Sequence, residues 1–186
     1  MSALAIPKDV LEHLATTPSI ASDAFVAGNA VIVGDVAVGT GSSIWYGCIL
    51  RGDVQRIRVG ARTNLQDGTI VHGTTHGHPA LIGDDVTVGH AAVLHACTIE
   101  DRAFIGIGAR VLDGAVVRSD AMLAAGAVLT PGKALPAGEL WAGNPAKLLR
   151  KLTPDEIEGI RISAARYVAL AHDYRTAPPS SFMRTR

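Results

Sequence analysis

The sequence is poor in aromatic residues and in cysteine, and each shortage excludes some classes of fold. Phe, Trp and Tyr make up only 4% of the 186 residues, although 48% are hydrophobic. The core must therefore be built from small and β-branched aliphatic side chains, which suit narrow, regularly stacked strands. The two cysteines, Cys48 and Cys97, are too few for a disulfide framework, so we interpret both as reduced core residues.

The chain also lacks a net charge and long apolar runs. Lys+Arg and Asp+Glu each number 17, so the chain lacks the basic excess that nucleic-acid binding requires. No segment approaches the roughly 20 apolar residues needed to span a bilayer. Lys8 and Asp9 follow Pro7 where a signal peptide would be apolar. We therefore expect a cytoplasmic protein that binds neither nucleic acid nor membranes.

An aliphatic residue recurs at every sixth position over much of the chain. The longest series comprises Val93, Ile99, Ile105, Val111, Val117, Leu123, Leu129 and Leu135. Shorter series occupy Val59, Leu65 and Val71, and then Ile82 and Val88. The step from Val88 to Val93 is five, which predicts a register slip there. A period of six fits neither an α-helix nor a simple strand, and it is the hexapeptide period of a β-helix.

Three hexads close a triangular coil of about 18 residues, and successive coils stack at about 4.8 Å. We predict an all-β fold, a single-stranded parallel β-helix over residues 26–150, rather than a β-sandwich with accidental periodicity. Residues 1–25 would form an N-terminal cap or strand that covers the open end of the first coil. The capping box Thr153–Glu156 predicts a C-terminal helix within 151–175, followed by a flexible tail over 176–186.

Five of the seven histidines fall between positions 72 and 95: His72, His76, His78, His90 and His95. His72 and His90 are one 18-residue coil apart, so we expect them at nearly equivalent positions on adjacent coils, with His95 across a corner. Three imidazoles with an open fourth position are typical of a catalytic zinc site, and they also suit iron or cobalt. The alternative is that these histidines are polar surface residues of a prism without metal.

An ordered set of motifs resembles the gamma-class carbonic anhydrases of the left-handed β-helix hexapeptide-repeat superfamily. The motifs are Arg51-Gly52-Asp53, Asn64-Leu65-Gln66-Asp67-Gly68, Val71-His72, Gly89-His90, Leu94-His95-Ala96 and the ending Gly143-Asn144-Pro145-Ala146-Lys147. The resemblance implies a left-handed helix and a homotrimer with metal sites at its subunit interfaces. His72 and His95 would come from one subunit and His90 from its neighbour.

The same resemblance assigns roles to the polar residues. Gln66 would lie close to metal-bound solvent, and Asn64 would be a further polar position near the site. Arg51 and Asp67 would form an ion pair between subunits, and Asp53 belongs to the same polar group. We therefore take these five residues as the candidate catalytic set.

His76 and His78 lie in the polar loop 73–80, either as solvated side chains or as a proton relay near the metal. Well-characterised members of the family use glutamates on an acidic loop as proton shuttles, whereas this loop has neither Glu nor Asp. Proton transfer would then depend on these histidines or on buffer, and hydration would be slow or absent even with metal bound.

The resemblance implies a lyase that reversibly hydrates carbon dioxide to bicarbonate on a divalent metal such as zinc, iron or cobalt. Two alternatives remain open from the sequence. One is a hexapeptide acyltransferase or an acyl-CoA thioesterase-type enzyme, and the other is a non-catalytic metal-binding trimeric relative.

Overall fold

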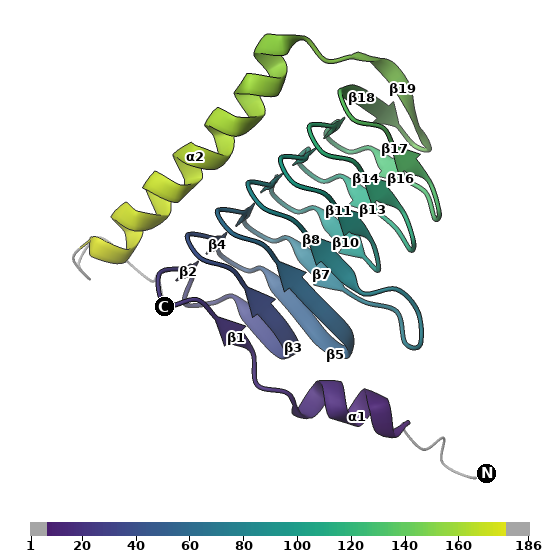
Figure 1. Cartoon of the computed structure of the whole chain (residues 1–186). Coiled ribbons are helices and arrows are strands. Elements are labelled where there is room, and N and C mark those ends of the chain that lie inside the picture. Colours follow the sequence, from purple (N-terminus) through teal and green to yellow (C-terminus); the bar gives the residue numbers. More distant parts are fainter. Residues whose placement is uncertain (1–6, 178–186) are drawn as a thin grey trace.

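The strands of the computed structural model, which describes residues 7–177, wind into a left-handed parallel β-helix with a long C-terminal helix beside it (Figure 1). The predicted fold class is confirmed. Two faces of the prism join into one 11-stranded sheet because two long strands run around a corner, and the third face is an 8-stranded sheet.

The strands sort by face. The two corner-turning strands are β3 (Val31–Val38) and β5 (Ile49–Val59). The β7–β10 face continues from their first halves with β7 (Ile70–His72), β10 (Val93–His95), β13 (Arg110–Val111) and β16 (Val128–Leu129). The β8–β11 face continues from their second halves with β1 (Ser19–Ile20), β8 (Ala80–Ile82), β11 (Thr98–Ile99), β14 (Val116–Val117) and β17 (Ala134–Leu135). The β6–β9 face contains β2 (Phe25–Val26), β4 (Ser43–Ile44), β6 (Asn64–Leu65), β9 (Thr87–Val88), β12 (Phe104–Ile105), β15 (Met122–Leu123), β18 (Glu139–Gly143) and the antiparallel β19 (Ala146–Lys151).

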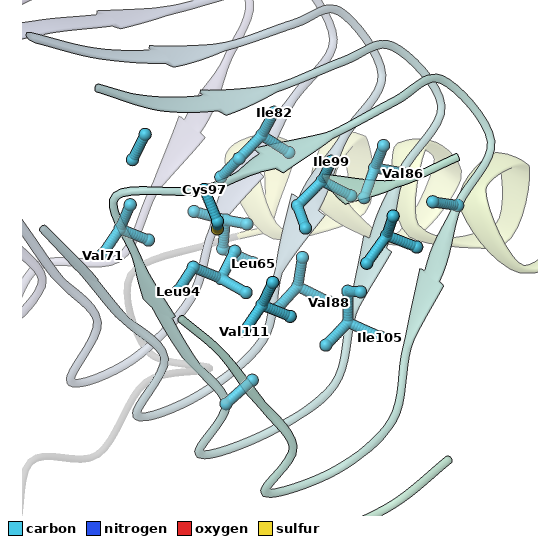
Figure 2. Packing of buried hydrophobic residues seen from close by; sticks show 14 of the residues in the cluster. Leu65, Val71, Ile82, Val86, Val88, Leu94, Cys97, Ile99, Ile105 and Val111 are labelled. Carbon is cyan, nitrogen blue, oxygen red and sulfur yellow. The ribbon is translucent and has the colours of Figure 1, made fainter. Parts of the chain in front are cut away.

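The aliphatic residues of the six-residue series fill the interior of the prism, and Figure 2 shows several of them packed together with Val86, Leu94 and Cys97. One assignment in the series is wrong. Leu94 is fully buried, whereas Val93 is only partly buried and belongs to the outer surface. The five-residue step therefore lies between Leu94 and Ile99 rather than between Val88 and Val93, because two adjacent aliphatic residues left the inward position ambiguous.

The coils differ in length. Along the β7–β10 face, register partners are separated by 18, 21, 23, 17 and 18 residues; they are Val31, Ile49, Ile70, Val93, Arg110 and Val128. The 23-residue coil includes an excursion over residues 73–79 between β7 and β8. Because of this excursion, the register partner of His72 is His95 and not His90. The predicted equivalence of His72 and His90 on adjacent coils is therefore wrong.

Two corner glycines show how tightly the later coils stack. Gly108 has a φ of +67°, a left-handed conformation that glycine adopts without strain. At Gly106 an added Cβ would lie 2.4 Å from the backbone nitrogen of Ala125 on the next coil. One glycine therefore supplies the turn, and the other permits the close approach of neighbouring coils.

Helices lie at both ends of the chain (Figure 1). Helix α1 (Lys8–Ala15), which we did not predict within residues 1–25, packs against β3 and β5. Helix α2 (Pro154–Thr176) begins with the predicted capping box at Thr153 and packs on β2, β4, β6 and β9. The predicted tail over 176–186 lies outside the described residues from position 178 onward. Neither described helix is long and apolar enough to cross a membrane.

Candidate metal centre

Two of the predicted metal ligands lie side by side. His72 on β7 and His95 on β10 are register partners on adjacent coils. Each directly follows a fully buried aliphatic residue, Val71 or Leu94, so strand alternation turns both imidazoles away from the core. His72 Nδ1 lies 3.2 Å from His95 Nε2, and the ring centroids are 5.3 Å apart.

The outer nitrogen of each imidazole meets a carboxylate. His72 Nε2 lies 2.9 Å from Asp53 Oδ1, and His95 Nδ1 lies 2.6 Å from Asp113 Oδ1. An ionised carboxylate can only accept a hydrogen bond, so both outer nitrogens must donate. A neutral imidazole carries one N–H, so the two nitrogens that face each other both present lone pairs. Facing lone pairs need a cation or a proton between them.

The pKa shifts favour this protonation pattern. Burial lowers the pKa of His72 despite the opposing hydrogen bond to Asp53, which disfavours an extra proton on the imidazole. Partial burial alone would raise the pKa values of Asp53 and Asp113. The hydrogen bonds that these carboxylates accept outweigh burial, so both pKa values lie below the usual range. The carboxylates are therefore ionised near neutral pH.

The histidine pair fits a metal ion. Two nitrogens that each lie 2.0–2.1 Å from one tetrahedral zinc ion are about 3.3 Å apart, close to the observed separation. A carboxylate behind each ligating imidazole, which fixes its tautomer, is also a common feature of metal sites. The donor set of His72 and His95, supported by Asp53 and Asp113, therefore suits a zinc-type ion.

His90 does not join this pair within one chain. It lies in the turn after β9, where its Nδ1 is 2.9 Å from Asp67 Oδ2, and both side chains are more than two-fifths exposed. Among residues 7–177 of a single chain, no three His, Cys, Asp or Glu side chains gather closely enough to hold an ion. One chain thus brings together two of the three predicted ligands and leaves His90 at an exposed corner.

Arg51 is next to the histidine pair. It is the register partner of His72, and its Nη1 donates to Asp53 Oδ2 at 2.5 Å. Within the chain, Arg51 is therefore paired with Asp53, while Asp67 is paired with His90. Arg51 is about half exposed, so its guanidinium remains accessible to a neighbouring molecule.

Gln66 and Asn64 form a buried pair on and beside β6. Gln66 Nε2 donates to Asn64 Oδ1 at 3.1 Å, and Asn64 Nδ2 donates to Thr87 Oγ1 at 3.0 Å. Thr87 in turn contacts Ser163 of α2, so Asn64 belongs to a polar row beneath that helix. The position of Asn64 suits it to orient the Gln66 amide.

His76 and His78 lie on the excursion 73–79, and both are exposed. The excursion closes on itself through hydrogen bonds from Thr74 N to His78 O and from Gly77 N to Thr74 O. The hydroxyl of Thr74 donates to the second carboxylate oxygen of Asp113. The loop is therefore attached directly to the group that supports His95.

The sequence interpretation missed Asp113 and Thr74. A weak signal for Asp113 was present, since it follows His95 by 18 residues, about one coil. The coil from β10 to β13 takes 17 residues, so Asp113 lies one position beyond strict register with His95. Thr74 carries no comparable signal, because the path of a loop does not follow from the repeat.

The chain is similar to several known proteins, although no protein-family model matches the sequence. "Gamma carbonic anhydrase 2, mitochondrial" of Arabidopsis thaliana is 52% identical over 171 residues, which cover 89% of this chain and 62% of the plant protein. "Carbonic anhydrase" of Geobacillus kaustophilus is 40% identical over 159 residues, which cover 86% of this chain and 87% of that protein.

A solved structure of a hexapeptide transferase family protein from Anaplasma phagocytophilum is also similar. It is 52% identical with a TM-score of 0.81, and the match covers 84% of this chain and 92% of that one. The chain spans only 62–64% of the length of three similar proteins from Arabidopsis. The bacterial matches, in contrast, extend over nearly their whole length.

Proposed function

The chain belongs to the gamma-class carbonic anhydrase family, and from this premise we propose that it catalyses the reversible hydration of carbon dioxide to bicarbonate as a metal-dependent lyase. The observation that carries the proposal is the pair of facing imidazole nitrogens, 3.2 Å apart, in rings that each meet a carboxylate on their other nitrogen. This arrangement suits a cation and has no evident purpose in a purely structural prism.

His72 and His95 would hold the metal from one chain and His90 from a neighbouring chain, leaving a fourth position open. Zinc fits this donor set, and iron or cobalt would fit it as well. Asp53 and Asp113 would keep the imidazoles in the ligating tautomer.

The surface around the pair supports a homotrimer. Val31, Ile49 and Ile70 are register partners on the β7–β10 face, and their side chains are 48%, 38% and 41% exposed. Aliphatic side chains in a continuous exposed row are typical of a surface that another protein covers. A neighbour packed on this row would bring His90 to the pair. Arg51 and Asp67 would then exchange their partners within the chain for an ion pair across the interface.

The remaining roles follow from the chain's own groups. A bound divalent metal lowers the pKa of water to about 7 and so supplies a nucleophile at neutral pH. Gln66 Nε2 donates one hydrogen bond to Asn64, and the carbonyl oxygen of the same amide can accept a hydrogen bond from the reacting water. His76 and His78 are exposed, and their imidazoles can pass the released proton to buffer.

The relatives bear on the alternatives and on the cell compartment. Several of them are named carbonic anhydrases at 40–52% identity, which does not favour an acyltransferase or a non-catalytic subunit. The Arabidopsis proteins are named as mitochondrial, so a cytoplasmic location of this chain stays a prediction.

The test is exchange of labelled oxygen between carbon dioxide and water, measured on the same preparation as metal content and particle mass. We expect about one metal per subunit and a trimeric mass for the unchanged protein. His90→Ala should lose metal and exchange activity, whereas His172→Ala on the exposed surface of α2 should retain both. Metal content that survives His90→Ala would contradict the ligand assignment. Release of CoA from acyl-CoA without oxygen exchange would favour the acyltransferase, and bound metal with neither activity would favour the non-catalytic relative.

A further inference from the structure

Asp113 lies where two separate parts of the chain meet. It follows β13, and its two carboxylate oxygens have different partners. Oδ1 lies 2.6 Å from His95 Nδ1, and Oδ2 accepts the hydroxyl proton of Thr74, which is 39 residues earlier in the sequence. One side chain thus contacts both a proposed metal ligand and the excursion 73–79.

The excursion is held to the coils on either side of it. On the preceding coil, Gln55 Nε2 donates to Gly77 O at 3.2 Å. On a later coil, Asp113 accepts a hydrogen bond from the hydroxyl of Thr74. His78 packs on the bare backbone of Gly114, where an added Cβ would lie 3.1 Å from its Nε2. The loop is therefore docked by side chains, and Asp113 provides one of the anchors.

Asp53 offers an internal comparison. It supports His72 as Asp113 supports His95, but its second oxygen accepts a hydrogen bond from Arg51, two residues away on the same strand. Asp53 therefore connects His72 only to a residue of its own strand. Only the second of these two carboxylates connects a ligand to the loop.

We propose that Asp113 is a positioning residue that couples the conformation of the excursion 73–79 to metal binding by His95. This inference rests on the proposed function, since it takes His95 as a ligand. The Thr74 hydroxyl fixes the rotation of the Asp113 carboxylate. That carboxylate fixes the proton of His95 on Nδ1 and leaves the Nε2 lone pair directed at His72. Thr74 thereby contributes to metal affinity without touching a ligand.

The experiment uses Co²⁺ as the probe, titrated against a competing chelator and followed by the absorption spectrum of the bound ion. Asp113→Ala should weaken Co²⁺ binding by about 10- to 100-fold, as is typical when the partner of a ligating imidazole is removed. Thr74→Val keeps the shape but removes the hydroxyl, and it should weaken binding by a smaller factor. Thr74→Ser should restore the affinity. Asp85→Ala is the matched control, because it removes a corner carboxylate that accepts hydrogen bonds from Arg62 and not from the loop or a proposed ligand.

Hydrogen exchange in the metal-free protein supplies the second readout. The amides of Thr74 and Gly77 should exchange faster in Asp113→Ala and in Thr74→Val, and at the original rate in Thr74→Ser and Asp85→Ala. This measurement reports the loop directly and does not depend on activity. Faster exchange accompanied by weaker Co²⁺ binding would support the coupling.

Two results would overturn the inference and leave the proposed function intact. One is Co²⁺ affinity in Asp113→Ala equal to that of the unchanged protein. The other is a Thr74→Val variant whose loop exchanges faster but whose Co²⁺ affinity is unchanged, because loop and ligand would then be independent. In contrast, Co²⁺ binding that survives His95→Ala would overturn the proposed function and this inference together.

Discussion

The early coils, residues 31–95, and the later coils, residues 98–140, share one interior but differ at their corners. Leu50, Val71 and Leu94 in the early part are as fully buried as Val111 and Leu129 in the later part. The later coils repeat every 18 residues, whereas the early ones take 18, 21, 23 and 17. Apart from Asp113, the whole candidate site lies in the irregular part.

The comparison teaches that length changes are tolerated at corners and not along the inward-facing positions. A few residues added to a surface loop cost little in closure entropy, because that cost grows slowly with loop length. The strands on either side keep their register, so the core is unchanged. Irregular corners are therefore where side chains can be added for chemistry without loss of the fold.

The largest effect should come from removing one histidine of the irregular part. We expect His95→Ala to abolish metal binding and to reduce carbon dioxide hydration to the background rate, because the two imidazoles that remain at each site, His72 and the His90 of a neighbouring chain, cannot complete it. Metal analysis and labelled-oxygen exchange on one preparation check this. Residual exchange at more than background level would mean that the site lies elsewhere.

Cavities of equal size in the two parts should separate stability from function. Leu94→Ala and Leu129→Ala should each lower the free energy of unfolding by about 2–5 kcal/mol, because both side chains are fully buried. Only Leu94→Ala, adjacent to His95, should also weaken metal binding. Denaturant unfolding and metal titration at low temperature measure the two effects. Equal loss of metal in both variants would remove the distinction between the two parts.

Substitution of two glycines in the later coils by alanine should lower stability by different amounts. Gly106→Ala places a Cβ 2.4 Å from a backbone nitrogen of the next coil, and we expect a loss of about 1–3 kcal/mol. Gly108→Ala meets no neighbouring atom and carries only the strain of its left-handed φ, about 1 kcal/mol. Thermal unfolding of both variants measures the difference. A larger loss at Gly108 would show that turn strain, rather than coil spacing, limits the regular part.

The smallest effect concerns the start of helix α2, which begins beside the last coils and packs on the first ones. Hydrogen bonds from Arg150, and then from the Thr153 backbone, lower the pKa of Glu156 to about 2. The unfolded chain, with its ordinary carboxyl pKa near 4.5, binds more protons between these values. The stabilisation is therefore complete above pH 4.5 and is lost as the pH falls toward 2.

Glu156→Gln should accordingly unfold at a lower temperature than the unchanged protein at pH 7 and at a similar temperature near pH 2. Thermal unfolding across this pH range is the measurement. A difference that persists at pH 2 would show that the charge of Glu156 is not the cause.

The regular coils were predictable from the sequence because each hexad repeats the same inward residue. The capping box at Thr153 likewise identified the start of α2 from four residues. Periodicity could not decide between Val93 and Leu94, which are adjacent and both aliphatic. That ambiguity concealed the pairing of His72 with His95 in the residue pattern, although the family resemblance had paired them.

Other features depend on contacts that no repeat encodes. Helix α1 has only eight residues, too few for a helical pattern to stand out, and it is held by tertiary contacts such as that of His13 with Asp35. Thr74 reaches Asp113 only because the excursion extends along the prism toward the coil that contains β13. Such contacts arise where the repeat is interrupted, and a periodic pattern says nothing about the conformation of an interruption.

The antiparallel strand β19 has a consequence for how many coils the molecule contains. A stack of identical parallel coils has no intrinsic length, since each new layer presents the same hydrogen-bonding rim as the one before. Strand β19 pairs antiparallel with β18, so its free edge does not have the hydrogen-bonding pattern that a further parallel coil would need. Its exposed side chains include Lys147, Arg150 and Lys151, which repel an identical rim on another molecule. On the β6–β9 face, the reversal therefore acts as a stop against the addition of a further parallel coil.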